Sequence, residues 1–440
     1  MKRILSLCLL AAMLFTLTAC FGQIESPAAD KNTFVTSPLP SPTLEEDSIL
    51  RRPDAAADVA DYAAVTETAP PEDVPPTDSN QEQTAPPPQI DIPQNKETRL
   101  SFVAVGDNII HSAIMEDAQK HAGNGQEYTF DYIYDNVRSR ISAADIAFVN
   151  QETPLGGKAL GYYGYPNFNG PQEAGDALVK AGFDVVCIAT NHMADMRDKG
   201  MSGSIAYWNS QPVTTVGGYV SKEDYETIRI HEKNGVKIAF LAYTYGTNGM
   251  SVSSSSGLVI PYLNVTDIRR HVAAAKEISD IVIVNMHWGD DSSFTVNAEQ
   301  KKYAQILADC GVDIVIGEHP HVLQPMQWMD GKDGHKMLLT YSIGNFLSTM
   351  YNDYFMVGGM LSFDIVKNDG GTHVENVQLI PTVTYYDANR ANLSVYFLDE
   401  FTHELASSHG TNAHGATSIE KLRSYVTKAI PKEFLPATYQ

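Results

Sequence analysis

The sequence predicts an α/β protein with a parallel core sheet and a second sheet packed on it. Short β-branched apolar runs, such as residues 185–189 and 281–285, are typical of buried strands. Helix-forming segments, such as residues 265–278 and 298–310, separate several of these runs. Repeated strand–helix units favour parallel pairing. The last runs of the folded part lack such helices between them, which favours an antiparallel second sheet.

Each predicted element follows from a local pattern. Lys233-Asn234-Gly235 between two apolar runs is a hairpin signature, and residues 265–278 have the spacing of an amphipathic helix. In chain order we expect strands at residues 100–105, 146–149, 185–189, 213–216, 228–231, 236–242, 281–285, 312–316, 337–341, 358–365 and 374–379, and helices at residues 132–142, 172–181, 202–210, 265–278, 298–310 and 417–430.

The first 20 residues predict export and lipid attachment. Lys2 and Arg3 precede an apolar run at residues 4–17, which suits the core of a signal peptide better than a membrane span. The run closes on Leu17-Thr18-Ala19-Cys20, which resembles a bacterial lipobox, so Cys20 is the predicted lipidation site. A plain secretion signal with a chance cysteine is the alternative. We expect a protein held by lipid on the outer face of the bacterial cell membrane.

Residues 21–97 predict a disordered, Pro-rich acidic stalk. The stretch is rich in Pro, Ser, Thr, Ala, Asp and Glu and poor in large apolar residues. Such a composition does not bury enough apolar surface to offset the entropy of ordering. Residues 98–385 are long enough for one large domain. Residues 386–440 are expected to form a helical extension packed on that domain.

Charge and cysteine content exclude several classes of function. The formal net charge is −22 at pH 7, and the folded part lacks basic clusters, so we expect no nucleic-acid partner. Only Cys187 and Cys310 lie in the predicted folded part. We expect both to be buried, inert thiols, and the sequence leaves open whether they form a disulfide. It offers no disulfide framework, so an apolar core must supply the stability.

Polar residues cluster directly after predicted strands, where open α/β sheets build their sites. The clearest cluster is His319-Pro320-His321, after the run at residues 312–316. Mixed carboxylate, amide and imidazole groups suit Mn²⁺, Fe or Zn²⁺. If the strands are neighbours in one sheet, the clusters converge on one crevice. The other clusters are Asp107-Asn108 with His111, Asn150-Gln151-Glu152, Asn191-His192-Met193-Ala194-Asp195 and His287-Trp288-Gly289-Asp290.

Six segments in this order resemble the CapA family, which includes the PgsA-type poly-γ-glutamate capsule proteins. The resemblance covers residues 98–385. It implies a branch of the calcineurin-like metallophosphoesterases, and with it a four-layer α/β/β/α sandwich with a two-metal centre. The segments are Val105-Gly106-Asp107, Asn150-Gln151-Glu152, Asn191-His192-Met193-Ala194-Asp195, His287-Trp288-Gly289, His319-Pro320-His321-Val322-Leu323-Gln324 and Tyr341-Ser342-Ile343-Gly344-Asn345-Phe346.

The resemblance also implies roles for single residues. Two divalent ions, Mn, Fe or Zn, would lie about 3.5–4 Å apart. His192 would be the general acid or a transition-state stabiliser, and Asp195 would hold its ring in one tautomer. Structural alternatives remain, such as a helix cap for Asp107 and a core histidine for His287. The predicted metal ligands are Asp107, Glu152, Asn191, His287, His319 and His321.

Two positions depart from the family pattern. Many metallophosphoesterases open with Asp-x-His, whereas this chain has Asp107-Asn108-Ile109. His111 could replace the missing ligand only if a turn brings it back. Glu318 stands where many relatives carry a basic or small residue, and we expect it to face solvent. Whether His111 or Glu318 contributes to the site stays open.

Three further residues are candidates to line a substrate site. Asn345 belongs to the last of the six segments. Tyr165 and Phe168 lie in an aromatic loop at residues 162–170, and aromatic side chains on a loop near a site often contact ligands. The alternative is a loop that folds its rings onto the core.

Three functions are compatible with these patterns. The first is a membrane-anchored extracellular protein that acts in synthesis, export or anchoring of poly-γ-glutamate or a similar capsule polymer. It would use a two-metal hydrolase-type site and work with membrane-bound polymer synthesis proteins. The second is a two-metal phosphodiesterase or phosphatase on another extracellular phosphoester. The third is a non-catalytic assembly subunit of a capsule synthesis complex. His192 beside the ligand set favours chemistry.

Overall fold

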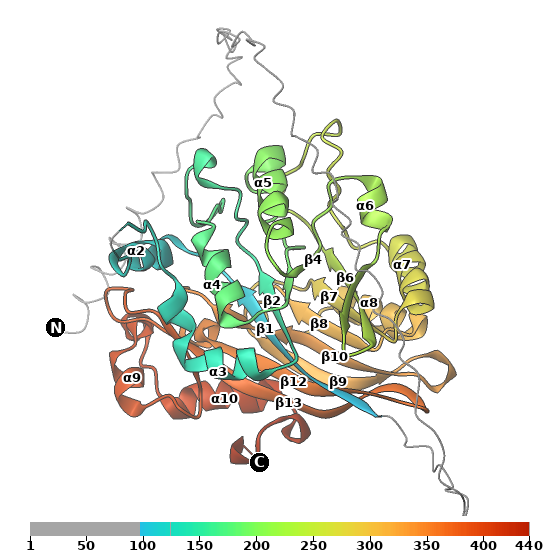
Figure 1. Ribbon diagram of the computed structural model, residues 1–440. Helices are drawn as coiled ribbons and strands as arrows, with labels where there is room; N and C mark the ends of the chain where they lie inside the picture. The colour runs from blue at the N-terminus through green and yellow to red at the C-terminus, as the bar shows by residue number, and fades with distance from the viewer. Residues whose placement is uncertain (1–96, 124, 440) are drawn as a thin grey trace, which may run out of the picture. The chain divides into compact units, whose positions relative to one another are not determined.

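The computed structural model describes residues 97–123 and 125–439 (Figure 1). The predicted signal peptide, Cys20 and almost all of the predicted stalk lie outside the described residues. Lipid attachment and localisation therefore stay predictions. Within the described part, no helix has the length and apolar character needed to cross a bilayer.

The first sheet has eight strands: β1 (Thr98–Asn108), β2 (Ile146–Gln151), β3 (Val185–Cys187), β4 (Thr214–Val216), β11 (Asn345–Leu347), β12 (Val357–Asn368), β13 (Gly371–Tyr385) and β14 (Ser394–Phe397). Their order is β14-β13-β12-β1-β2-β3-β4, with β11 paired to β1. Strands β1 to β4 run parallel. Strands β12, β13 and β14 extend the β1 side of this sheet by antiparallel pairing.

The second sheet has six strands: β5 (Arg229–Lys233), β6 (Val236–Thr244), β7 (Ile281–His287), β8 (Ile314–Glu318), β9 (Leu323–Asp330) and β10 (Lys336–Ile343). Their order is β5-β6-β7-β8-β10-β9. The central strands β6, β7, β8 and β10 are parallel, and β5 and β9 add antiparallel edges.

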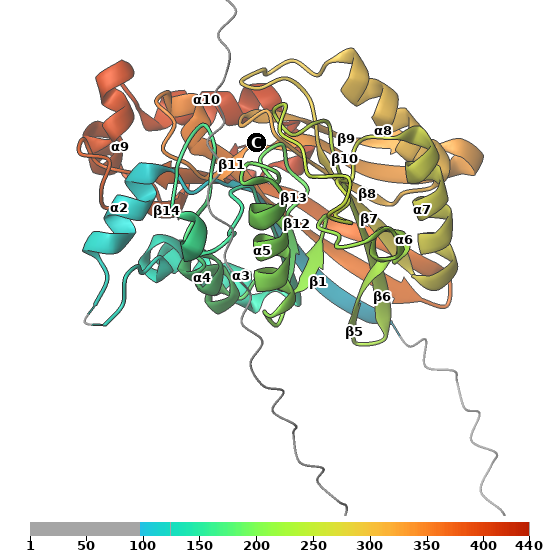
Figure 2. The same cartoon turned by 90° about the horizontal axis from the view of Figure 1, so that it is seen from above.

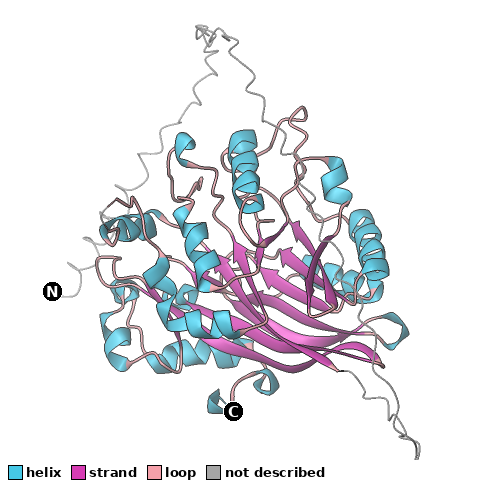
Figure 3. Ribbon diagram, viewed as in Figure 1, coloured by secondary structure: helices cyan, strands magenta, loops and turns pink. Residues whose placement is uncertain are grey.

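Helices cover the outer faces of both sheets (Figures 2 and 3). Helices α7 and α8 pack on the second sheet, and α3 and α4 lie on the opposite side of the molecule. This layering confirms the predicted α/β/β/α sandwich. The helices are α2 (Ser112–Lys120), α3 (Asp135–Ala143), α4 (Glu173–Ala181), α5 (Arg197–Asn209), α6 (Lys222–Glu226), α7 (Val265–Ile278), α8 (Ala298–Cys310), α9 (His403–Ser408) and α10 (Ile419–Ala429).

The prediction for the last strands was wrong in one respect. The runs at β12 and β13 do not build a separate second sheet, because they pair with β1 and extend the first. The second sheet is instead built from the hairpin β5–β6 and the strand–helix units that follow it. Pairing between β1 and β12 joins residues more than 250 positions apart, and local sequence patterns do not report such partners.

Aromatic side chains hold the two sheets together. Phe102 of β1 stacks on Phe363 of β12 and on Phe240 of β6, with ring centroids 4.6 and 6.3 Å apart. Phe148 of β2 also lies 6.3 Å from Phe240. All four rings are buried, and burial of one such ring contributes roughly 1.5–3 kcal/mol. This core fixes how the ends of the two sheets face each other.

Two free cysteines lie in the described part, so no disulfide joins them. Cys187 is buried, as predicted, and its thiol lies 3.2 Å from the Asn285 amide oxygen. Cys310 is only half-buried at the end of α8, which corrects the expectation that it is buried.

Candidate metal centre

The polar clusters come from the carboxyl ends of strands in both sheets. Asp107 lies near the end of β1, and Glu152 follows β2. His287 ends β7, and His319 and His321 follow β8. The clusters do converge, but the condition that their strands share one sheet does not hold, because they meet across the two sheets. The parallel strands of both sheets must end at the same edge of the molecule for this to happen.

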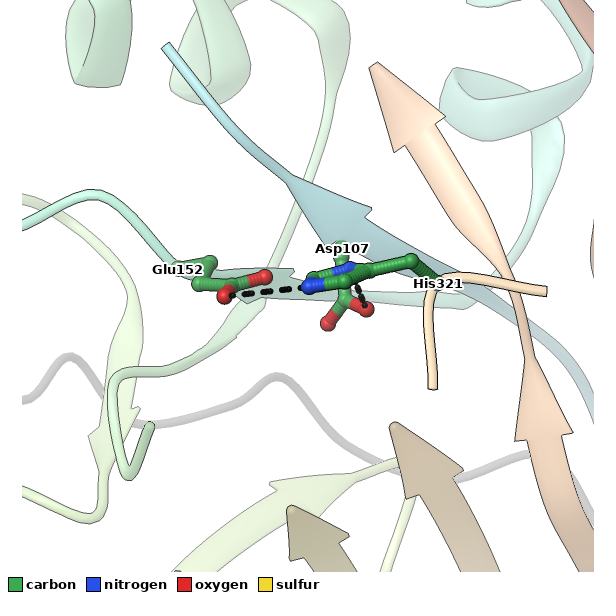
Figure 4. Close-up of side chains that lie close together, drawn as sticks. All are labelled: Asp107, Glu152 and His321. Atoms are coloured by element: carbon green, nitrogen blue, oxygen red, sulfur yellow. Dashed lines mark hydrogen bonds and ion pairs between the residues drawn. The ribbon is translucent and has the colours of Figure 1, made fainter. Parts of the chain in front are cut away.

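Asp107, Glu152 and His321 form the centre of the site (Figure 4). One potential ligand atom from each lies within 4.8 Å of the other two, and all three side chains are buried. His321 Nδ1 lies 3.1 Å from Asp107 Oδ2 and 3.0 Å from Asn345 Oδ1. Both of these neighbours are acceptors, so Nδ1 carries the proton. His321 Nε2 is left facing Glu152, with 3.8 Å to Oε1.

The other predicted ligands lie directly beside this group. His287 Nε2 is 3.0 Å from Asn191 Oδ1. The His319 ring lies between two other imidazoles, with centroids 5.0 Å from His287 and 5.7 Å from His321. The structure therefore brings all six predicted ligands together at one edge. Their arrangement as metal ligands stays a prediction.

Backbone strain surrounds the two histidines after β8. His319 and His321 have φ values of 95° and 60°, on either side of Pro320. Positive φ is uncommon for residues other than glycine, and such strain clusters at functional sites. Asp107 accepts the backbone N–H of His319 at 3.2 Å, which ties this loop to β1. The strained turn places the His321 ring against Asp107 at the end of the first sheet and the His319 ring beside Tyr245 and His287.

Burial sets the charge states of the histidines. It lowers the pKa of His319 to about 3, with His321 adding to the effect. It holds the pKa of His287 well below its ordinary value, with His319 as the next cause. Burial alone would also lower the pKa of His321, but the carboxylates of Glu152 and Asp107 outweigh it and raise that pKa to about 10. His287 and His319 are therefore neutral imidazoles, the form that binds metals.

The buried carboxylates of the site have too little positive charge around them to balance their own. Burial raises the pKa of Glu152 well above its ordinary value; His321 opposes this rise, and Asp107 adds to it. Several buried ligand atoms have no hydrogen-bond partner among the described residues. Buried charges and polar atoms are costly unless they are paired or bind a metal, so this donor set fits divalent cations. The unpartnered atoms include Glu152 Oε2, His287 Nδ1 and His319 Nδ1.

His192 and Asp195 form a buried pair beside the predicted ligands. His192 Nδ1 lies 2.7 Å from Asp195 Oδ2, so the ring donates to the carboxylate. Nε2 faces the opposite way, 3.8 Å from Glu152 Oε1 and 3.4 Å from Asn248 Nδ2. The same carboxylate oxygen of Asp195 accepts the backbone N–H of Phe168 at 2.6 Å. These contacts fix the His192 ring with one nitrogen toward the site.

A hollow of about 370 Å³ opens above these residues. Its walls include Glu152, Asn191, His192, His319 and His321. The aromatic loop also lines it, and its two candidate residues lie differently. Tyr165 is 76% exposed, whereas Phe168 is buried with its ring edge-on to His192 at 4.7 Å. The exposed Tyr165 thus fits the alternative of a ligand-contacting loop, and the buried Phe168 fits the alternative of a ring folded onto the core.

The sequence prediction of a solvent-facing Glu318 was wrong. The residue is fully buried at the end of β8, and neither carboxylate oxygen has a hydrogen-bond partner among the described residues. Burial raises its pKa well above the ordinary value, and Asp107 and Glu152 add to the rise. Its Oε2 would lie 3.1 Å from a Cβ at Gly106. Glycine at that position of β1 therefore avoids a tight contact with this carboxylate.

The departure at Asn108 has a structural explanation. Its amide donates to Gln151 at 2.7 Å and accepts from the Tyr134 hydroxyl at 2.9 Å, so Asn108 belongs to a buried polar network. His111 does turn back to line the hollow. Its ring is outside the group of close ligand atoms formed by Asp107, Glu152 and His321.

Three neighbours of the site were not singled out from the sequence. Asn150 donates to Asp107 Oδ1 at 2.7 Å and so orients the carboxylate. Tyr245 lies with its ring 4.5 Å from that of His319. Asn248 is within 3.4 Å of both Asn191 and His192. Asn150 lies in one of the six segments that resemble the CapA family, whereas Tyr245 and Asn248 follow β6 and belong to no motif.

Comparisons with known proteins agree with the sequence resemblance. The family model described as "Bacterial capsule synthesis protein PGA_cap" matches residues 101–350. The capsule biosynthesis protein CapA of Bacillus anthracis is 26% identical over 265 residues, which cover 58% of this chain and 61% of that protein. The PGA biosynthesis protein CapA of Bacillus subtilis (strain 168) is 32% identical over 202 residues, 46% of this chain and 52% of that protein. The chain thus spans about half to three-fifths of these relatives.

Solved structures also align with the chain at low identity. A calcineurin-like phosphoesterase from Bacillus subtilis, YfkN, is 14% identical with a TM-score of 0.38, covering 74% of this chain and all of that one. A putative 5'-nucleotidase from Staphylococcus aureus is 11% identical with a TM-score of 0.41, covering 64% and 54%.

Proposed function

Since this chain belongs to the bacterial capsule synthesis protein PGA_cap family, we propose that it acts in synthesis, export or anchoring of poly-γ-glutamate or a similar capsule polymer, through a two-metal hydrolase-type site. The observation that carries the proposal is the meeting of Asp107, Glu152 and His321 within the matched region. Two relatives are named for capsule or PGA biosynthesis. The family match alone does not indicate which reaction the protein performs. The buried group of potential metal ligands is the reason to propose metal-dependent hydrolysis.

The proposed metal ligands are the six residues at the strand ends. Bound divalent ions would supply Lewis-acid activation and a nucleophilic water. Asn150 and Asn345 contact Asp107 and His321 and would keep these ligands oriented. Burial of the whole set keeps the ligands apart from bulk solvent, which strengthens electrostatic interactions within the site.

His192 is the proposed proton-transfer group. Its Nδ1–H donates to Asp195, so Nε2 is the nitrogen available to the hollow. When protonated, Nε2 would give its proton to a leaving group, or stabilise negative charge that develops there. Asp195 would act through His192 by holding the tautomer. Phe168 packs edge-on against the imidazole and limits its rotation.

The proposed location follows from the N-terminal sequence. Lipid on Cys20 would hold the protein at the outer face of the bacterial cell membrane. Residues 21–97 would act as a stalk between the lipid and the folded part. At that position the site would meet the polymer and the membrane-bound proteins that make it.

The test uses the full chain in a polymer-making bacterium that lacks its own copy of the gene. Surface polymer is measured as γ-linked glutamate per cell for the parent, His192→Ala and the double variant His319→Ala/His321→Ala. His373→Ala is the matched control, because His373 is exposed and, among the described residues, its side chain pairs with Glu375 alone. We expect loss of polymer with both site variants and parent levels with the control.

Other outcomes separate the alternatives. Polymer lost only with the double variant would indicate a non-catalytic assembly subunit whose metal site supports the fold. Polymer unchanged in every variant, with metal-dependent phosphodiester hydrolysis by the purified full chain, would indicate an extracellular phosphoesterase. Metal analysis of the same purified proteins should find about two Mn, Fe or Zn ions per chain in the parent, and a loss in the double variant.

A further inference from the structure

A second hollow adjoins the candidate metal centre. It has a volume of about 430 Å³ and shares His111, Tyr165 and Met350 with the hollow above the predicted ligands. The two hollows therefore form one groove, and a ligand long enough to fill it would touch both ends. The far end is lined by Thr349, Tyr351, Asn352, Phe355 and Arg390, among others.

Arg390 gives the far end its charge. It is the only lysine or arginine among the described residues that line either hollow. The guanidinium lies 4.7 Å from the Tyr351 ring and 6.0 Å from the Tyr386 ring. The described residues hold no carboxylate in an ion pair with it, and its buried Nε has no hydrogen-bond partner there. No carboxylate of the described residues thus balances its charge, and the end of the guanidinium that a ligand in the groove would meet is Nη1, 3.4 Å from the Tyr351 hydroxyl.

Local structure fixes where Arg390 lies. Its backbone has a φ of 57° and its N–H donates to the Asp387 carbonyl at 2.8 Å. The guanidinium donates to the Thr349 carbonyl, and the Tyr386 hydroxyl donates to the Met350 carbonyl at 2.7 Å. Met350 lines both hollows. These hydrogen bonds therefore attach the turn that carries Arg390 to a residue that lines the hollow above the predicted metal ligands.

The junction between the hollows is uncharged. Burial, with smaller contributions from His321 and Arg390, lowers the pKa of His111 to about 3, so its ring is neutral. Tyr165 is 76% exposed beside it, and Tyr351 is 57% exposed at the far end. An extended ligand would thus meet predicted metal ligands, a neutral aromatic junction and one guanidinium in turn.

Resting on the proposed function, we infer that Arg390 and Tyr351 form a subsite for a free α-carboxylate of an extended γ-linked glutamate chain, whose neighbouring unit lies at the hollow above the predicted metal ligands. A single guanidinium balances the one charge of a carboxylate and can bind it through two parallel hydrogen bonds. A phosphate monoester carries closer to two charges near neutral pH, which Arg390 alone would not balance. Arg390 also lies outside the region that matches the family model.

Binding of defined ligands tests this subsite. The metal-loaded full chain is titrated with a fluorescent γ-linked glutamate decamer, and Kd is measured by anisotropy for the parent, Arg390→Gln and Arg390→Lys. Arg270→Gln is the control, because Arg270 is an exposed arginine whose ion-pair partners, Glu226 and Asp267, lie outside both hollows. We expect Arg390→Gln to weaken decamer binding about tenfold or more. Arg390→Lys should weaken it less, and the control should match the parent.

Inorganic phosphate, titrated as a competitor of the decamer, shows whether Arg390 binds a carboxylate or a phosphate. Its affinity should be the same in the parent and Arg390→Gln, because phosphate reports on the metal hollow. An equal loss for phosphate and decamer would overturn the carboxylate assignment, and parent-like decamer binding by Arg390→Gln would overturn the subsite. A parent that binds phosphate but no decamer would instead overturn the proposed polymer role. If Arg390→Gln does not fold, parent-like decamer binding by Arg390→Lys overturns the subsite.

Discussion

At the scale of single residues, Asp195 has contacts that define a narrow role. Its Oδ2 accepts from both His192 Nδ1 and the Phe168 backbone, so Asp195→Asn would present an amide to a ring that needs an acceptor. We expect kcat for metal-dependent hydrolysis of bis(p-nitrophenyl) phosphate to fall about 10²-fold, with KM and metal content near parent values. Asp198→Asn, at the start of α5, is the control. Equal losses of kcat and metal content would assign Asp195 a structural role instead.

Glu318 gives a second prediction, for the metal-free protein. Because burial, Asp107 and Glu152 raise its pKa, the folded state favours the protonated carboxyl. The contribution of Glu318 to stability is then complete below its unfolded pKa of about 4.3 and is lost as the pH rises toward the folded pKa. We expect Glu318→Gln to stabilise the metal-free protein at pH 8 by on the order of 1–3 kcal/mol.

Thermal unfolding in a chelator checks this prediction at two pH values. The stabilising effect of Glu318→Gln should be clear at pH 8 and nearly absent at pH 4.5. Glu232→Gln is the control, because Glu232 is exposed on β5. A stabilisation of the same size at both pH values would show that ionisation of Glu318 is not its cause.

The sequence predicted which residues would lie together better than it predicted their surroundings. Strand-end motifs correctly pointed to residues that meet, such as Asp107 and His321. The burial of Glu318 could not be predicted, because it depends on how β8 packs beside β1, a strand far away in the chain, where a Cβ at Gly106 would come within 3.1 Å of Glu318 Oε2. Arg390 was not singled out for the same reason, since no motif surrounds it and only the fold brings it to the groove.

At the scale of elements, helix boundaries with strong local signals were predicted well. The predicted helices at residues 265–278 and 298–310 coincide with α7 and α8. Asn264 caps the first, and Asn297 with Gln300 forms a capping box at the second, which ends at Gly311 in the left-handed conformation. Such caps lie next to the helices they bound, so the sequence reports them directly.

The parallel pairing of β1 with β11 gives a prediction for a single methyl group. A Cβ at Gly106 would lie 1.8 Å from the carbonyl oxygen of Gly344, which also accepts the Asp107 N–H at 3.1 Å. Gly106→Ala must therefore push Gly344, the residue before β11, away from β1. We expect a loss of about 3 kcal/mol or more in the free energy of unfolding, measured by urea titration, together with weaker metal binding.

A glycine in open space provides the control for this substitution. A Cβ at Gly246 would meet no atom within 4 Å, so Gly246→Ala should leave stability near the parent value. If Gly106→Ala were as stable as Gly246→Ala, the close approach of β1 and β11 would not be needed for the fold.

At the scale of the whole molecule, the division of strands between sheets was the main feature that the sequence did not predict. Strand β10 belongs to the second sheet, yet β11 and β12, which follow it in the chain, pair with β1 in the first sheet. Alternating apolar residues identify a strand but not its partner. The same division places the candidate ligands on opposite sheets, so the site depends on how the sheets pack through Phe102 and Phe240.

This division predicts that metal binding stabilises the packing of the two sheets. Asp107 and Glu152 come from the first sheet, and His287, His319 and His321 come from the second. Ions bound by both sets would favour the folded state by about 2.7 kcal/mol when free metal is 100 times its Kd. Chelation should therefore lower the unfolding temperature of the metal-loaded full chain. The double variant His319→Ala/His321→Ala should unfold at the same temperature with and without chelator. A parent that loses its metal without any fall in unfolding temperature would show that the two sheets hold together independently of the ions.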